Sequence, residues 1–367
     1  MPSLPFAIRR PVLLVRGTLL NRREPNLEHL GSLDDPDRFG WAILPHVARS
    51  FAVSVVWLPK SAAHAARVGY LYARMLDSYE DMVPDAAQRI AGLRWFAERF
   101  ATRDFTTPPP PVALAPRTRR EEVHRLLVER RDLVDRLFGD LPPSDRDSVA
   151  VMVTAMAASM ERWGTTFLAQ GGVLETTTQL DQYCDDVIGE PARFATALMV
   201  KQPLSESQTE QISGVAEFIQ LANITRDIER DLERGVAYHP SLRPVLGRSD
   251  DEATDAIRGV RSELLARALR RSPSYTSLLI NMPLPTVSAG RGSGVVMLLF
   301  TDRYYRNCAA TAGHEPWKGK NSTLSILWSG LLAVFSRSWT ARVARRVRER
   351  MLVAAEAIDA RGIRGDS

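Results

Sequence analysis

The stretch Tyr70-Leu-Tyr-Ala-Arg74-Met-Leu-Asp77-Ser-Tyr-Glu80-Asp81 is the most informative part of this chain. Its pattern predicts a helix on which Asp77 and Asp81, four residues apart, project from the same face. Neighbouring carboxylates repel each other unless a cation lies between them, and oxygen ligands of this kind suit Mg²⁺. A solvated acidic face is the simpler alternative for one such motif taken alone. A second motif of the same chemistry would favour metal binding.

A second segment of this kind occurs much later in the chain. The run from Gln220 to Asp231 places oxygen-bearing side chains at positions i, i+4 and i+8 of a predicted helix: Asn223, Asp227 and Asp231. The opposite side of this helix is apolar, with Leu221, Ile224 and Ile228 as candidate core residues. A packed back and a line of oxygen ligands in front indicate that the helix lines a cavity.

The composition is typical of a globular α-helical protein. The chain has 367 residues, of which 45% are hydrophobic, enough for a substantial core. Apolar residues recur with a helical period, which favours an all-α class, and one helical domain is the simplest assignment. Besides the second acidic helix, helices are expected over 39–58, 62–82, 85–99, 121–138, 145–169, 178–200 and 252–271, with an extended loop at 106–116 and a Pro/Gly-rich turn at 283–294.

Charge and cysteine content limit the kinds of binding partner and the cellular compartment that we expect for this chain. The formal net charge of +5 fits anionic substrates or an anionic membrane surface, although ordinary surface charge explains it equally well. No nucleic-acid-binding module is recognisable, so nucleic acid is not an expected partner. Cys184 and Cys308 have neither metal nor disulfide spacing, which favours a cytoplasmic location. The apolar stretch 324–335 is too short to span a membrane, and the basic helix behind it leaves peripheral membrane contact open.

Four ordered blocks resemble the squalene/phytoene synthase family. They are Arg49-Ser50-Phe51, the stretch from Tyr70 to Asp81, Tyr183-Cys184-x-x-Val187-x-Gly189, and Asn223-Ile224-x-Arg226-Asp227-x-x-x-Asp231. The resemblance implies an all-α, single-domain class I isoprenoid synthase, a helical bundle with a central pocket. In that fold Mg²⁺ ions bridge the two acidic faces to prenyl diphosphates. The implied domain covers residues 41–350, with an N-terminal extension at 1–40 and a C-terminal tail at 351–367.

The resemblance also implies roles for individual residues. The implied metal ligands are Asp77, Glu80, Asp81, Asn223, Asp227 and Asp231. The implied catalytic residues are Tyr183, Arg74, Asp77 and Asp227. The implied substrate-binding residues are Ser50, Phe51, Tyr70, Arg74, Val187, Gly189, Gln220 and Arg226.

The expected activity is Mg²⁺-dependent head-to-head condensation of two farnesyl or geranylgeranyl diphosphates. The family forms a cyclopropylcarbinyl diphosphate and then a squalene-, dehydrosqualene- or phytoene-type product. NADPH is a further candidate cofactor, required where the product is reduced, and the sequence does not decide whether it is used here. Neither the substrate chain length nor the oligomeric state is predicted.

Two departures from the family pattern leave alternatives open. Arg230 occupies the glutamate position of a motif that usually reads D-x-x-E-D, where a cation can weaken a metal site, bind substrate phosphate or point outward. Ile188 replaces a usual alanine, and Glu190-Pro191 interrupts small or aliphatic positions, so the shape of the pocket is open. The alternatives are a class I cyclase acting on one prenyl diphosphate and a non-catalytic homologue serving as a binding or assembly protein.

Overall fold

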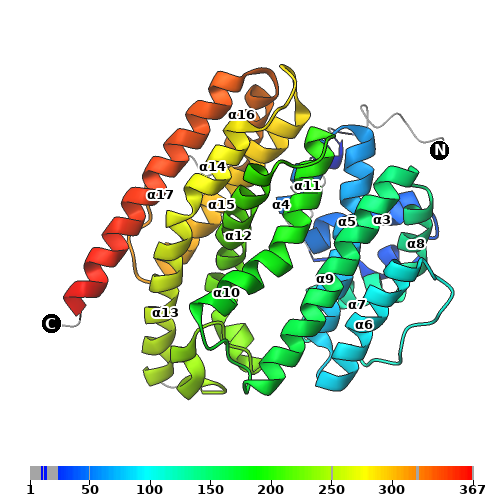
Figure 1. The fold of residues 1–367 in the computed structure, drawn as a ribbon, viewed down its shortest axis with the longest axis horizontal. Helices are drawn as coiled ribbons and strands as arrows, with labels where there is room; N and C mark the ends of the chain where they lie inside the picture. The colour runs from blue at the N-terminus through cyan, green and yellow to red at the C-terminus, as the bar shows by residue number, and fades with distance from the viewer. Residues whose placement is uncertain are drawn as a thin grey trace. The chain divides into compact units, whose positions relative to one another are not determined.

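The computed structural model of the chain describes residues 10, 12–14, 24–48, 50–248, 251–319 and 322–365, with side chains at 50 and 361–365 left out. Helices make up most of this chain (Figure 1). The described residues contain no β-strand, and a single parallel bridge joins Val173 to Ala237. The all-α prediction is therefore confirmed. None of the helices in the described part is long and apolar enough to span a membrane.

Contacts divide the chain into two compact units. Unit 1 comprises Met1–Gly164 and Phe194–Gln202, and unit 2 comprises Thr165–Arg193 and Pro203–Ser367. The first helices are α2 (Leu27–Gly31), α3 (Pro36–Ala48), α4 (Ser50–Trp57), α5 (Lys60–Met82), α6 (Ala86–Thr102), α7 (Arg119–Glu129), α8 (Arg131–Gly139) and α9 (Pro143–Ala169). The later ones are α10 (Thr177–Cys184), α11 (Glu190–Val200), α12 (Glu206–Glu233), α13 (Asp251–Arg270), α14 (Ser272–Asn281), α15 (Ala289–Thr311), α16 (Thr323–Phe335) and α17 (Arg337–Gly365).

The proposed domain boundaries remain predictions. Residue 40 lies inside α3, and residue 351 lies inside α17. The division into an extension, a domain and a tail therefore does not coincide with breaks between helices. Of the three boundaries between the two units, one falls within α9, one within α11 and one between α11 and α12.

Helix α5 is the central element of unit 1. It packs against α3, α4, α6, α7 and α8 through a face of alanine, leucine and aromatic residues. The Tyr72 ring packs edge-on against Phe100, with 4.7 Å between ring centres, and its hydroxyl donates a hydrogen bond of 2.7 Å to Asp135. Burial of one large apolar side chain contributes about 1.5–3 kcal/mol, so this face fixes the rotation of α5. The acidic stripe is consequently left on the other side.

Helix α12 is the central element of unit 2. Ser205 and Gln208 form a capping box at its start, which satisfies backbone N–H groups that a helix N-terminus leaves unpaired. The helix packs against α10, α13, α14 and α15. Its buried Phe218 lies 5.2 Å from the Tyr305 ring, and the Tyr305 hydroxyl donates to the Phe218 carbonyl. These contacts direct the polar stripe of α12 away from the core.

Three predicted elements need correction. The expected helix over 121–138 is two helices, α7 and α8, separated at Arg130. The expected helix over 178–200 is interrupted by a π-helical segment, Asp185–Gly189. The expected turn over 283–294 ends at Ser288, because α15 already begins at Ala289. The extended loop at 106–116 is confirmed.

Candidate functional site

The first acidic face lies on α5 in unit 1. Tyr70, Arg74, Asp77, Glu80 and Asp81 are all half-buried, whereas most of the residues between them are buried. The helix therefore carries the predicted side chains on one accessible stripe, as their spacing requires. Val83 and Pro84 end the helix directly after this stripe.

A chain of contacts holds the Arg74 guanidinium beside Asp77. Arg74 Nη1 lies 3.2 Å from Asp77 Oδ2, and Arg74 Nη2 donates to the Tyr70 hydroxyl at 3.3 Å. Tyr70 in turn donates to the Val47 carbonyl at 3.1 Å and stacks on Phe51, with ring centres 4.5 Å apart. Phe51, Tyr70 and Asp77 are thus brought together with Arg74 in one chain of contacts. Ser50 begins α4, and its side chain lies outside the described part.

Burial and neighbouring charges shift the pKa values of two side chains on this stripe. Burial raises the pKa of Asp77 to about 6, with Arg74 lowering it and Asp81 raising it. Burial lowers the pKa of Arg74, but Tyr70, Asp77 and Asp81 raise it more, so Arg74 stays charged. A divalent ion beside Asp77 would favour its ionised form, because an opposite charge offsets the effect of burial.

The second acidic face lies on α12 in unit 2. Asn223, Asp227 and Asp231 are half-buried, while Leu221, Ile224 and Ile228 on the opposite side are at most 2% exposed. Gln220 is buried and accepts a hydrogen bond of 3.1 Å from Asn223 Nδ2. The carboxylate and amide oxygens of this stripe are the ligand types that Mg²⁺ prefers.

A row of arginines runs beside these ligands on α12. Arg226, Arg230 and Arg234 repeat every four residues, as do Asn223, Asp227 and Asp231. Arg226 donates to both carboxylate oxygens of Asp227, with Nε 2.7 Å from Oδ1, and Arg234 Nη1 lies 3.6 Å from Asp231 Oδ1. Arg230, which occupies the usual glutamate position of the second motif, is half-buried in the middle of this row. The face therefore presents cations as well as oxygen ligands.

Tyr183 belongs to an aromatic group in unit 2. Its side chain is 2% exposed, and its hydroxyl lies 3.2 Å from the Tyr238 hydroxyl. Phe167 packs edge-on against both rings, at 6.0 Å from Tyr183 and 5.8 Å from Tyr238. The sequence interpretation did not include Tyr238 among the site residues. The signal was its place directly after the second acidic helix, in Gly235-Val-Ala-Tyr238-His239-Pro240.

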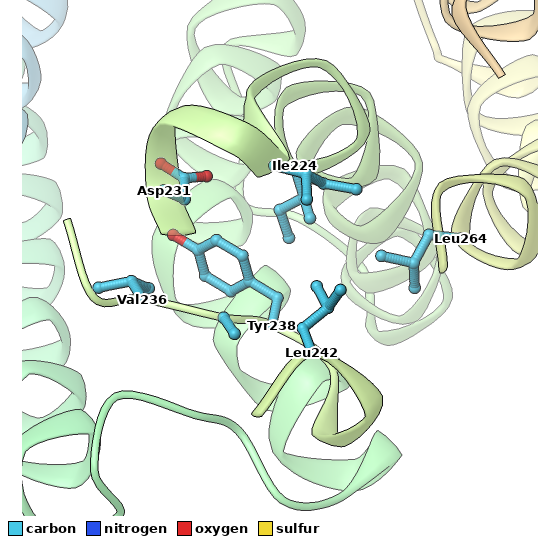
Figure 2. Close-up of a pocket in the computed structure, with 8 residues that line it drawn as sticks. Ile224, Asp231, Val236, Tyr238, Leu242 and Leu264 are labelled. Atoms are coloured by element: carbon cyan, nitrogen blue, oxygen red, sulfur yellow. The ribbon is translucent and has the colours of Figure 1, made fainter. Parts of the chain in front are cut away.

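The backbone around residue 237 fixes the position of Tyr238. Ala237 N donates to the Gly172 carbonyl at 2.8 Å, and Leu174 N donates to the Ala237 carbonyl at 3.0 Å. A shallow, narrow hollow lies next to this strand-like pairing. It is lined by Ile224, Ile228, Asp231, Val236, Ala237, Tyr238, Leu242 and Leu264. Figure 2 shows the Tyr238 hydroxyl on the same side of the hollow as the Asp231 carboxylate.

The third predicted block adopts an unusual helical form. Val187 and Gly189 are buried in the π-helical segment between α10 and α11. Pro191 has no N–H to donate to the Val187 carbonyl four residues earlier, which favours a local departure from α-helical pairing. A Cβ added at Gly189 would lie 2.4 Å from Asp185 Oδ1, so the glycine permits a close approach. Such π-helical segments are frequent at functional sites.

The predicted residues form one set in each unit. Unit 1 holds Ser50, Phe51, Tyr70, Arg74, Asp77, Glu80 and Asp81. Unit 2 holds Tyr183, Val187, Gly189, Gln220, Asn223, Arg226, Asp227 and Asp231. Within the residues that the structure describes, no three or more His, Cys, Asp and Glu side chains form a group arranged to hold a metal ion. The roles of these residues remain predictions.

Comparisons with known proteins agree with the sequence blocks. Residues 44–274 match the family model described as Squalene/phytoene synthase. The chain is 28% identical over 204 residues to squalene synthase BSS of Botryococcus braunii, covering 54% of this chain and 41% of that protein. It is 24% identical over 261 residues to the squalene synthase of Rattus norvegicus, covering 68% of this chain and 58% of that protein. The chain thus spans about half the length of the curated relatives it matches.

Solved structures show the same fold. A structure of TcSQS in complex with the ligand BPH1237 has a TM-score of 0.63 and 20% sequence identity, covering 88% of this chain and 99% of that one. A second TcSQS complex, with the ligand E5700, gives the same TM-score and identity. The predicted class I isoprenoid synthase helical fold is therefore confirmed.

Proposed function

Because the chain belongs to the squalene/phytoene synthase family, we propose that it condenses two prenyl diphosphates head to head. The observation that carries the proposal is that residues 44–274, which match the family model, include both oxygen-lined stripes, on α5 and on α12. Each stripe lies on a helix whose opposite face is packed in a core. Farnesyl and geranylgeranyl diphosphate are the candidate substrates.

The chain's polar residues would bind the charged end of the substrates. When bound, Mg²⁺ neutralises the charge of the leaving diphosphate. Asp77, Glu80 and Asp81 would hold metal on α5, and Asn223, Asp227 and Asp231 would do so on α12. Arg74 and Arg226 are placed among these ligands, and their guanidinium groups would donate hydrogen bonds to diphosphate oxygens, which strengthen as negative charge develops.

The carbon chemistry needs a dry environment. The C–O bond of one allylic diphosphate breaks, and the electron pair leaves with diphosphate. The double bond of the second molecule adds to the resulting cation, and loss of a proton closes a cyclopropane ring. Buried residues such as Val187 and Leu221 would help to exclude water from the cation. Tyr183, oriented by Tyr238, is our candidate for steering the cation or receiving the proton.

The decisive test is an incubation with farnesyl or geranylgeranyl diphosphate, with and without Mg²⁺ and NADPH, followed by identification of products by mass. We expect a C30 or C40 product that requires Mg²⁺, and the NADPH dependence will identify the reduced or unreduced branch. A C15 or C20 hydrocarbon or alcohol would instead establish the cyclase alternative. Absence of Mg²⁺-dependent turnover would favour the non-catalytic alternative.

Matched variants connect the reaction to the two stripes. Asp77→Asn and Asp227→Asn keep side-chain size while removing one carboxylate from each helix, and each should lower kcat at least 100-fold, as loss of a preorganised electrostatic group does. Asp147→Asn and Asp255→Asn are the controls, because these carboxylates are 70% and 75% exposed. The controls should retain full activity.

A further inference from the structure

Helix α16 in unit 2 directs its large apolar side chains to solvent. Leu324, Trp328, Leu331 and Phe335 are 78%, 59%, 38% and 63% exposed. Their separations of four, seven and eleven residues from Leu324 place them on one stripe of the helix. Single exposed apolar residues are common, but a stripe of four that includes Trp and Phe marks an interaction surface. We call these four residues the α16 stripe.

The opposite face of α16 holds the helix firmly on the protein. Ile326, Gly330 and Ala333 are buried, and α16 packs along α15. At the C-terminal end, Ser288 N donates to the Val334 carbonyl at 2.9 Å, and Arg291 Nε donates to the Ala333 carbonyl at 3.1 Å. The α16 stripe is thus the outer face of an anchored helix.

The sequence that contains α16 and the first turns of α17 carries charge of one sign. Residues 316–348 contain no Asp or Glu and seven basic residues: Lys318, Lys320, Arg337, Arg342, Arg345, Arg346 and Arg348. Arg342, Arg345 and Arg346 are exposed on the first turns of α17, which starts two residues after α16 ends. An apolar stripe next to cations without acidic neighbours in the sequence complements a surface that is both apolar and anionic.

We propose that the α16 stripe docks the protein on a bilayer containing anionic lipid. Its apolar side chains enter the boundary between head groups and acyl chains, where Trp is favoured, and the arginines of α17 bind lipid phosphates. Helix α16 has 13 residues, too few to cross a bilayer, so it lies in the interface. A second copy of the chain is a poorer partner, because a symmetric contact would bring two basic segments together. The proposal does not depend on the reaction.

Vesicle flotation with the full chain tests this proposal. The probes are phosphatidylcholine vesicles with and without phosphatidylglycerol, at low and high salt. We expect binding to the anionic vesicles that weakens as salt rises. The triple variant Leu324→Ser/Trp328→Ser/Phe335→Ser should bind at least tenfold more weakly. The variant Arg342→Gln/Arg345→Gln/Arg346→Gln should lose about 100-fold on anionic vesicles, since each basic residue near such a surface contributes about 1 kcal/mol.

Two controls keep the outcome decisive. Val353→Ser changes a valine that is 65% exposed on α17, and Val151→Ser changes one that is 65% exposed on α9. Both should bind vesicles as the unchanged protein does, and circular dichroism should show the same helix content in every variant. Equal binding by the stripe variant, or no binding by the unchanged protein, would overturn the proposal. A dimer that becomes monomeric in the stripe variant, without vesicle binding, would identify a second copy as the occupant.

Discussion

Arg230 is the departure from the family pattern that bears most directly on the proposed metal site. It is the middle member of the row Arg226, Arg230 and Arg234, which runs beside the proposed metal ligands on α12. We predict that Arg230→Glu, which creates the usual D-x-x-E-D motif, will lower the Mg²⁺ concentration for half-maximal turnover about tenfold. The substitution replaces a cation by an anion next to the proposed metal ligands, and a tenfold change needs only about 1.4 kcal/mol.

The control for Arg230→Glu separates this local effect from the change in net charge. Arg258→Glu makes the same change on α13, where the side chain is 58% exposed and pairs with Asp255. It should leave the Mg²⁺ requirement unchanged. If Arg230→Glu also leaves the Mg²⁺ requirement unchanged, then Arg230 has no role in metal binding.

A second prediction for single residues concerns the contact between the Tyr183 and Tyr238 hydroxyls. The two oxygens are 3.2 Å apart, and the Tyr183 side chain is almost fully buried. A hydrogen bond in this setting contributes about 0.5–1.5 kcal/mol. A double-mutant cycle of Tyr183→Phe and Tyr238→Phe, measured by urea unfolding, should give a coupling energy in that range. If the losses of unfolding free energy in the two single variants add up to the loss in the double variant within about 0.3 kcal/mol, the two hydroxyls do not stabilise each other.

At the scale of elements, the turn after α9 positions the segment that carries Tyr238. Gly172 has φ of +88°, and a Cβ there would lie 2.0 Å from the Gly235 carbonyl oxygen. We predict that Gly172→Ala lowers the free energy of unfolding by at least about 3 kcal/mol, because left-handed strain and overpacking add. Gly235→Ala is the matched control: its φ is +75°, but nothing lies within 4 Å of the added Cβ.

The two glycine variants are compared by urea unfolding under the same conditions. Gly235→Ala should lose only about 1–2 kcal/mol, the strain of a positive φ in a non-glycine residue. Equal losses in the two variants would mean that the Gly172–Gly235 approach is relieved by a small backbone shift. In that case the bridge between Val173 and Ala237 is not the feature that holds this segment.

Sequence periodicity predicted the helices whose packing is amphipathic. The first acidic helix was expected over 62–82 and extends over Lys60–Met82, because buried positions that recur every three to four residues indicate a helix with one packed face. The turn expected over 283–294 is wrong after Ser288, where α15 begins. Gly290, Gly292 and Gly294 lower the local helix propensity, but they do not prevent a helix. The Arg291 side chain donates to carbonyls of the preceding loop and of α16, and these tertiary contacts stabilise α15.

The break between α7 and α8 at Arg130 also depends on tertiary contacts that the local sequence does not indicate. Its guanidinium donates to the Leu33 carbonyl at 3.0 Å and pairs with Asp34 at 2.9 Å, almost 100 positions away along the chain. Local sequence between 121 and 138 contains no Pro or Gly that would mark a boundary. Likewise, the Tyr238 hydroxyl contacts the Tyr183 hydroxyl although the two residues are 55 positions apart in the chain. The β-bridge between Val173 and Ala237, which lies next to Tyr238, is not encoded by any short motif. Motif spacing thus predicted the candidate ligands on each helix, but not the aromatic partner that tertiary structure brings to Tyr183.

At the scale of the whole molecule, each compact unit carries one of the two oxygen-lined stripes. If both stripes are needed to bind Mg²⁺ and a prenyl diphosphate, the ligands will stabilise the folded chain, and removing a carboxylate from either unit will abolish that effect. A ligand at 100 times its Kd adds about 2.7 kcal/mol to the free energy of unfolding. We therefore predict a rise in Tm with Mg²⁺ and a non-reacting farnesyl thiodiphosphate.

The rise in Tm should disappear with EDTA, which removes the metal, and in both Asp77→Asn and Asp227→Asn, because each variant lacks one proposed metal ligand. Asp147→Asn and Asp255→Asn, whose carboxylates are mostly exposed, should keep the full rise. Differential scanning calorimetry measures the shift without requiring turnover, so it separates binding from catalysis. A variant that keeps the rise but loses turnover would place its carboxylate in the chemical step. A rise that survives in Asp227→Asn alone would assign metal and diphosphate binding to the α5 stripe, and the arginine row of α12 would then need another role.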